Sequence, residues 1–211
     1  TKEKERATTA ETNAKEEAAI ATAVNNFLQN LLAQAAPEKN ARNKKVTVEE
    51  VLGRAAASII GKFEKQPRIE AAIRQTIGDT YRRLGDYPAA QPHLERALEL
   101  RRRVLGEEHP HTLNSMNILA LLYGRQGAFG KAEPLFIQAL EVGRRVLGEE
   151  HPHTLASMNN LAALYYHQGQ YPKAEPLYVK TLEVSRRVLG EEHPDTLTTT
   201  NNLAKVYQNQ D

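Results

Sequence analysis

One motif recurs three times at a constant spacing of 42 residues, and this repetition constrains the fold more than any other feature of the chain. The strings VLGEEHPHTL, VLGEEHPHTL and VLGEEHPDTL begin at Val104, Val146 and Val188. Over one full period, residues 104–145 and 146–187 agree at 29 of 42 positions. Such a period is typical of a supersecondary unit that stacks on copies of itself, because no single copy can bury its apolar face alone.

The pattern within each period predicts two helices, which we call helix A and helix B. In the third copy Pro152 opens helix A, Gly169 ends it, and helix B ends at Gly190. Apolar residues at three- and four-residue spacing give helix A a buried face: Leu155, Met158, Leu161, Ala162 and Tyr165. A small residue recurs where the two helices are expected to cross closely: Gly78, Ala120, Ala162 and Ala204.

Three prolines fall about one turn inside helix B of successive copies: Pro92, Pro134 and Pro176. A proline at such a position removes a backbone hydrogen bond. Helix B is therefore expected either to start late or to have a bent first turn.

Residues 1–36 read as one long helix with a heptad seam that Glu17 interrupts. The seam consists of Ala7, Ala10, Ala14, Ala21, Val24, Leu28, Leu31 and Ala35. Two interpretations remain open. The helix either folds back on the repeats as a connecting element, or forms a coiled coil that joins two chains into a homodimer through residues 1–36.

A linker and a second helix separate this segment from the repeats. Pro37 ends the long helix, and residues 37–45 have the composition of a loop. Thr47 and Glu50 form a capping box, flanked by Val46 and Val51 at the hydrophobic-staple positions, and the helix is expected to run to about Lys65. The predicted organisation is an N-terminal region, 1–66, followed by repeats at 67–106, 109–148, 151–190 and, in part, 193–211.

The register of Ala162, Tyr165, Gly169, Tyr171 and Ala174 resembles that of the tetratricopeptide repeat, which normally has 34 residues. The 42-residue form, with His-Pro before helix A and AEPL in helix B, resembles the kinesin light chain subtype. The matching helix A segments are 115–127, 157–169 and 199–210. The proline that closes the 34-residue repeat is absent, and helix B is expected to continue to Leu189. The resemblance covers about residues 68–211 and implies an all-α, right-handed α-solenoid.

A second resemblance concerns the region before and at the start of the repeats. Residues 23–37 and 66–87 are similar to the segment between membrane helix and repeats in some large bacterial Ser/Thr kinases with tetratricopeptide tails. The chain also begins in mid-pattern at Thr1, so we interpret it as a piece of a longer protein. No kinase motif occurs in these residues.

Composition excludes several function classes. The formal net charge is +2, and no basic run is longer than Arg101 to Arg103, which argues against nucleic acid as a partner. Cysteine is absent, so no disulfide or thiolate metal site can form. No apolar run is long enough for a membrane helix, and no signal peptide is recognisable. A cytoplasmic location is favoured, although the sequence leaves the compartment open.

Histidines and paired glutamates could suggest a metal site or acid–base catalysis, but both recur with the fold. His109, His151 and His193 occupy equivalent turns, where we expect them to cap helix A or to pack. The pairs of glutamates precede helix A, where negative charge is favourable. No phosphate-binding loop or nucleophile elbow is present. We therefore predict no enzyme activity, no metal and no cofactor.

Five asparagines lie in the middle of helix A, where asparagine is a poor helix former: Asn117, Asn159, Asn160, Asn201 and Asn202. In the tetratricopeptide family, helix A lines a concave groove whose asparagines hold a ligand backbone. The resemblance implies this role here, with Arg82, Arg83, Arg125 and Lys205 reading acidic side chains. The competing interpretation is that these amides join helix to helix.

The predicted function is a protein-interaction module that binds a peptide or partner segment in this groove. The alternative is a structural or self-regulatory segment of a larger signalling enzyme that binds no separate ligand.

Overall fold

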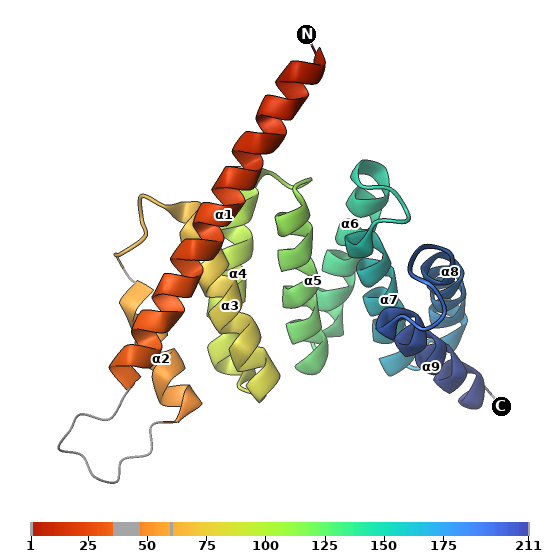
Figure 1. Cartoon of the computed structure of the whole chain (residues 1–211). Helices are drawn as coiled ribbons and strands as arrows, with labels where there is room; N and C mark the ends of the chain where they lie inside the picture. The colour runs from red at the N-terminus through yellow and green to blue at the C-terminus, as the bar shows by residue number, and fades with distance from the viewer. Residues whose placement is uncertain (1, 36–46, 60, 211) are drawn as a thin grey trace. The chain divides into compact units, whose positions relative to one another are not determined.

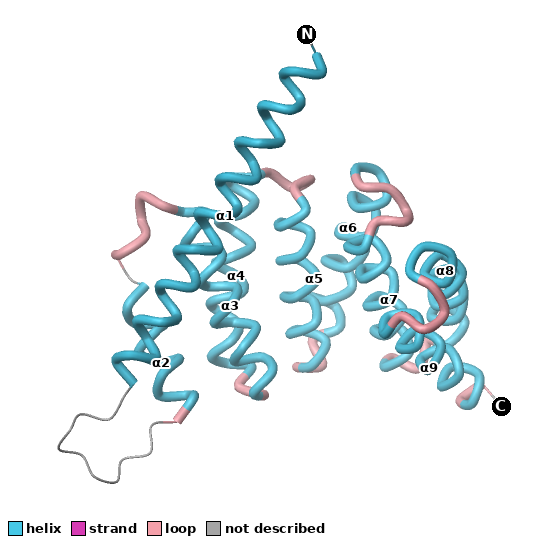
Figure 2. Tube along the Cα trace, in the orientation of Figure 1, coloured by secondary structure: helices cyan, strands magenta, loops and turns pink. Residues whose placement is uncertain are grey.

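The computed structural model describes residues 2–35, 47–59 and 61–210, and these residues form helices and connecting turns without any strand (Figure 2). The predicted linker at 37–45 and the staple residue Val46 lie outside the described residues. The side chains of Ala7, Ala10, Leu31 and Ala35 in the heptad seam are also not described. The helices, labelled in Figure 1, are α1 (Lys2–Ala35), α2 (Val48–Ile59), α3 (Pro67–Leu84), α4 (Tyr87–Leu105), α5 (Pro110–Arg125), α6 (Phe129–Val146), α7 (Pro152–His167), α8 (Tyr171–Leu189) and α9 (Pro194–Gln208).

The chain divides into two compact units, an N-terminal unit of residues 1–100 and a C-terminal unit of residues 101–211. The boundary falls inside α4. In the N-terminal unit, α1 contacts both α2 and α3. Phe27 of α1 is only 5% exposed, and its ring centre lies 6.0 Å from that of Phe63 in an edge-to-face arrangement. Because α3 is the first helix A, α1 packs on the repeat region as the connecting-helix interpretation expects. Homodimerisation through residues 1–36 stays a prediction.

The predicted extent of the second helix was wrong. The capping box forms its first half, since the Glu50 backbone N–H donates to Thr47 Oγ1 at 3.1 Å. The helix, however, ends at Ile59 and not near Lys65. Gly61 has a φ of +75°, a left-handed conformation that stops helices and that glycine adopts at little cost. Phe63 consequently lies in the turn that follows and not on the face of α2.

In the C-terminal unit each helix from α5 to α9 contacts the next along the chain, and helix A also contacts helix A: α5 meets α7, and α7 meets α9 (Figure 1). The core between them includes Met116, Ala120, Met158 and Ala162, all fully buried. The predicted small-residue position is tight in the first repeat, where a Cβ added to Gly78 would lie 2.7 Å from the Leu94 side chain.

Helix B does not start late. It begins at Tyr87, Phe129 and Tyr171, and the prolines lie inside it. Each proline falls in the second turn, where its missing N–H removes one hydrogen bond close to the N-terminus of the helix. The expected extension of helix B is confirmed, because α8 continues through Arg187 to Leu189.

Histidine caps helix A in all three repeats of the C-terminal unit, as one interpretation of the sequence predicted. His109, His151 and His193 are the N-cap residues of α5, α7 and α9, and each accepts a backbone N–H through its side chain. A proline follows at the first helical position, where its lack of an N–H costs nothing.

Candidate functional site

A groove of about 520 Å³ opens on the A helices of the C-terminal unit. Helices α5, α7 and α9 supply most of its lining, and we call it the helix A groove. Its apolar part includes Ala120, Leu121, Phe129, Phe136 and Leu164. Phe136 and Tyr178 reach it from the B helices, so aromatic rings and aliphatic side chains form a substantial part of the surface.

The polar part of the groove carries basic side chains and amides. Arg125, His167 and Lys205 lie in the last turns of α5, α7 and α9, where positive charge is favourable beside the free carbonyl groups. Asn160 and Asn202 line the same groove. Among the described residues, neither Arg125 nor Lys205 has a carboxylate within 4.0 Å. Their charges are therefore available to an external anion.

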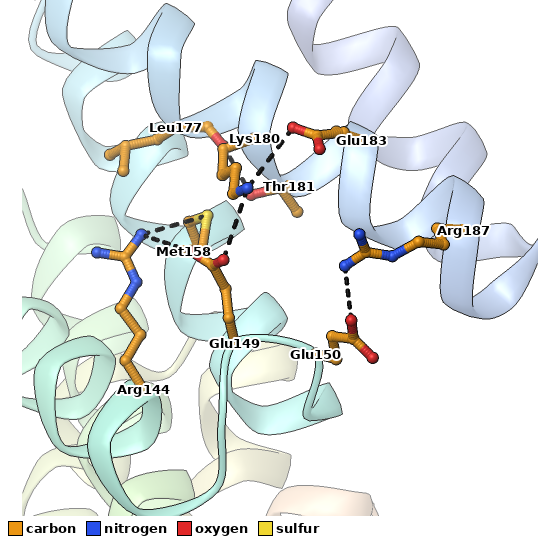
Figure 3. A network of polar contacts seen from close by, with 9 residues as sticks. All are labelled: Arg144, Glu149, Glu150, Met158, Leu177, Lys180, Thr181, Glu183 and Arg187. Atoms are coloured by element: carbon orange, nitrogen blue, oxygen red, sulfur yellow. Dashed lines mark hydrogen bonds and ion pairs between the residues drawn. The ribbon is translucent and has the colours of Figure 1, made fainter.

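The arginines late in helix B contrast with these groove cations, because they are paired. Arg187 contacts Glu150 at 2.6 Å, and Glu149 lies 3.6 Å from Arg144 and 3.5 Å from Lys180 (Figure 3). One period earlier, Arg145 contacts Glu108 at 2.8 Å. The paired glutamates of the turns thus take part in ion pairs that join consecutive repeats.

The five candidate asparagines occupy two neighbouring positions of the repeat, and the structure separates them. Asn117 is 5% exposed, and its amide nitrogen donates to the Leu113 carbonyl at 3.1 Å and to Ser157 Oγ at 2.7 Å. One period later, Asn159 Oδ1 accepts from Thr199 Oγ1 at a longer 3.4 Å. These two amides connect one helix A to the next.

The next residue along the helix faces the groove instead. Asn160 and Asn202 are half-buried in its wall, whereas Asn201 is exposed and lines no described cavity. A second cavity of about 370 Å³ lies among α7, α8 and α9 and is lined by Asn159, Asn160 and His193, among others. Asn160 lines both cavities, so the two are adjacent along the A helices.

Arg82 and Arg83 lie in the N-terminal unit, and both bond the same carboxylate. Each Nε donates to an oxygen of Asp79 at 2.8 Å. Burial raises the pKa of Asp79, but the hydrogen bonds from Arg83 and Arg82 outweigh that effect and hold the pKa below its ordinary value. Both guanidinium groups are thus engaged within the chain.

Sequence reasoning missed several groove residues, including Phe129, Tyr166 and His167. One available signal was Gly124, which stands where the other repeats carry Arg82, Tyr166 and Gln208. The missing side chain leaves room between α5 and α7, since a Cβ at Gly124 would meet only the Leu164 side chain, at 3.6 Å. A glycine at a repeat position that otherwise carries a larger side chain therefore indicates additional room at that point of the groove.

The described part of the chain contains no group of three or more His, Asp or Glu side chains arranged to hold a metal ion. Of the helices that the structure describes, none has both the length and the apolar character needed to cross a membrane.

Comparison with known proteins identifies the family. The model of the tetratricopeptide repeat matches residues 69–141, 117–180 and 155–211, which together span most of the chain. The chain therefore belongs to the tetratricopeptide repeat family. A protein of Hyaloscypha variabilis described as nucleotide-binding leucine-rich repeat (NLR)-like is 55% identical over 45 residues. That match covers 21% of this chain and only 4% of the fungal protein.

Solved structures with a similar fold include kinesin light chain-like proteins. A putative kinesin light chain of Podosopora anserina with nearly identical TPR-like repeats has a TM-score of 0.65 and 26% identity, covering 91% of this chain and 85% of that one. BtubC (BKLC) from P. vanneervenii has a TM-score of 0.66 and 25% identity, covering 77% of this chain. This chain spans 65% of the length of BtubC. The resemblance to the kinesin light chain subtype is confirmed.

Proposed function

We propose that the C-terminal unit binds an extended segment of a partner protein in the helix A groove. The tetratricopeptide fold is generally a protein–protein interaction module. One observation supports binding in this particular groove. Arg125 and Lys205 line it, and neither has a carboxylate neighbour among the described residues. In this proposal they bind an acidic side chain of the segment.

The amides of Asn160 and Asn202 hold the backbone of the bound segment in this proposal. An amide offers a donor and an acceptor together, which matches the N–H and C=O groups of an extended chain. Asn117 and Asn159 are assigned to joining consecutive A helices, because their amides already bond Ser157 and Thr199. Arg82 and Arg83 are not assigned to binding, since both guanidinium groups already pair with Asp79 within the N-terminal unit.

The groove offers no arrangement for covalent chemistry. Its polar groups are amides, basic side chains and the phenols of Tyr166 and Tyr178, and the family to which the chain belongs typically supplies scaffolds. We accordingly propose binding without catalysis and without a cofactor.

The test compares neighbouring asparagines. Proteins captured from a lysate by the immobilised chain are quantified for the wild type, for Asn160→Ala with Asn202→Ala, and for Asn201→Ala. Each lost hydrogen bond contributes on the order of 1 kcal/mol, so the double variant should bind specific partners about tenfold or more weakly. Asn201→Ala is the matched control, because Asn201 is exposed outside the groove, and it should bind as the wild type does.

A second measurement examines the cations. Fluorescent, terminally blocked peptides of equal length that carry glutamate or lysine at the same positions are titrated with the wild type and with Arg125→Gln plus Lys205→Gln. Preference for the acidic peptide should disappear in the variant and weaken at high salt. Equal binding of both peptides by the wild type contradicts the acidic specificity. A folded chain that captures no partner at all supports the alternative, a structural or self-regulatory segment of a larger signalling enzyme.

A further inference from the structure

Histidine is an uncommon cap, and its geometry here is the same in three repeats. His109, His151 and His193 have extended backbones with ψ near 137°. In each, Nδ1 accepts the backbone N–H of the residue two positions later, at 3.2 Å, 3.1 Å and 3.2 Å. Each bond satisfies one of the N–H groups that a helix leaves free at its start.

The usual capping residues accept through oxygens that stay unprotonated near neutral pH, whereas an imidazole nitrogen accepts only while it is deprotonated. Protonation of Nδ1 would place a donor against a donor and end the bond. It would also put a positive charge at the positive end of the helix dipole. Both effects act in the pH range where histidine titrates.

The three starts differ in the residue that provides the capped N–H. At α5 and α7 it is a second histidine, and the two rings lie with centres 5.3 Å apart in each pair. At α9 it is Asp195, whose Oδ2 lies 3.8 Å from His193 Nδ1. Protonation therefore creates repulsion between neighbouring imidazoles at the first two starts and an ion pair at the third.

Neighbouring charges do not offset that repulsion at α7. In its turn, Glu149 contacts Arg144 and Lys180, and Glu150 contacts Arg187 (Figure 3). The carboxylates that lie nearest in sequence to His151 and His153 are thus already bound to cations. At α9, Glu191 lies 3.9 Å from Arg186 and is largely exposed, as is Glu192.

The pKa of His153 also indicates that the start of α7 is less stable in acid. Burial lowers the pKa of His153, and the charges of His151 and His111 lower it further. A histidine whose pKa is lowered by folding binds its proton more readily in the unfolded chain. Its contribution to stability is therefore present above the ordinary value near 6.5 and is lost as the pH falls below it.

We propose that the histidine caps make the starts of the A helices acid-labile, and that the His-Pro-His start of α7 opens more readily in acid than the His-Pro-Asp start of α9. His193, Pro152 and Asp195 line the second cavity beside the helix A groove. If the groove binds a partner as proposed above, acid also loosens this end of the binding surface.

The experiment measures amide hydrogen exchange of the whole chain at pH 7.5 and pH 5.5, corrected for the intrinsic pH dependence of exchange. The Leu155 N–H, which donates to the His151 carbonyl at 3.0 Å, reports opening of the start of α7 and should lose protection by on the order of tenfold in acid, the effect expected for one lost cap. The Leu197 N–H, which donates to the His193 carbonyl at 3.0 Å, reports the start of α9 and should lose less. Equal protection of Leu155 at both pH values, or an equal loss at Leu197, overturns the proposal.

Two variants at α7 separate the causes. His151→Asn keeps a good capping residue that does not titrate, so the acid-dependent loss at Leu155 should disappear. His153→Asp copies the start of α9 and should reduce the loss at Leu155 to the level seen at Leu197. An unchanged loss in His151→Asn contradicts the proposal. In the wild type, ¹⁵N shifts of the imidazole of His151 should report an unprotonated Nδ1 at pH 7.5, and a protonated Nδ1 there would also overturn it. No ligand enters these measurements, so their failure is distinct from failure of the proposed function.

Discussion

The two units of the molecule obtain their contacts in different ways. In residues 101–211 the same contact recurs after 42 residues, as in the histidine caps and in the Glu108–Arg145 and Glu150–Arg187 pairs. In residues 1–100 the contacts between α1 and the turn after α2 occur once. Phe27 meets Phe63, and Lys62 lies 6.0 Å and 5.6 Å from the centres of these two rings. The comparison teaches that a periodic sequence specifies the same contact several times, whereas the packing of α1 in the N-terminal unit depends on single residues.

The largest effect is expected where a single contact has no second copy. Phe27→Ala removes a side chain that is buried against the turn after α2, and it should lower the stability of the N-terminal unit by about 3 kcal/mol. Hydrogen exchange during urea unfolding should show the loss in α1 to α3. Val48→Ala is the control, because Val48 is exposed in the same unit, and it should change stability by less than about 0.5 kcal/mol. An equal loss of protection in α5 to α9 would contradict the independence of the two sets of contacts.

The next effect concerns one position of the repeat in two surroundings. Ala162 is fully buried, whereas its equivalent Ala204 in α9 is exposed. Ala162→Leu should overpack the core and cost roughly 1–3 kcal/mol, while Ala204→Leu should be nearly neutral. Thermal denaturation of the two variants measures the difference. Similar melting temperatures would contradict the difference in burial between Ala162 and Ala204.

Much of the fold could be predicted from the sequence, because each helix-start and helix-end signal recurs in several repeats. The 42-residue period predicted the helix pairs, the glycines that end helix A and the histidine caps. The end of α2 was missed because Phe63 continues the apolar spacing past Ile59, while the left-handed Gly61 gives only one weak stop signal. The early start of helix B was left open because proline is usually read as a helix boundary.

The candidate site was harder to predict, for a geometrical reason. Adjacent residues in a helix point about 100° apart, so Asn159 and Asn160 face different neighbours although the sequence shows only a pair of asparagines. Apolar groove residues such as Phe129 gave no sequence signal, because an aromatic residue near a helix start serves equally well as core. Tertiary packing alone distinguishes these roles.

A smaller effect tests the separation of the two asparagine positions. Asn117→Ala removes the 2.7 Å hydrogen bond to Ser157, while Ser157 keeps its own bond to the His153 carbonyl. The expected loss of stability is about 1 kcal/mol. Asn201→Ala, at the equivalent but exposed position of α9, should be neutral or slightly stabilising, because alanine is the better helix former. Chemical denaturation with equal midpoints for both variants would contradict the role of Asn117 in joining α5 to α7.

The smallest effect is expected for the periodic ion pairs. Glu150 and Arg187 are 2.6 Å apart, but both side chains are about 60% exposed, at 61% and 60%. Water and salt screen such a pair, so Glu150→Gln should cost less than about 1 kcal/mol, and the cost should vanish at high salt. Glu192→Gln, at the equivalent position one period later, is the control, because no ion pair is observed for Glu192 among the described residues. A large, salt-independent loss for Glu150→Gln would contradict the small contribution expected of an exposed ion pair.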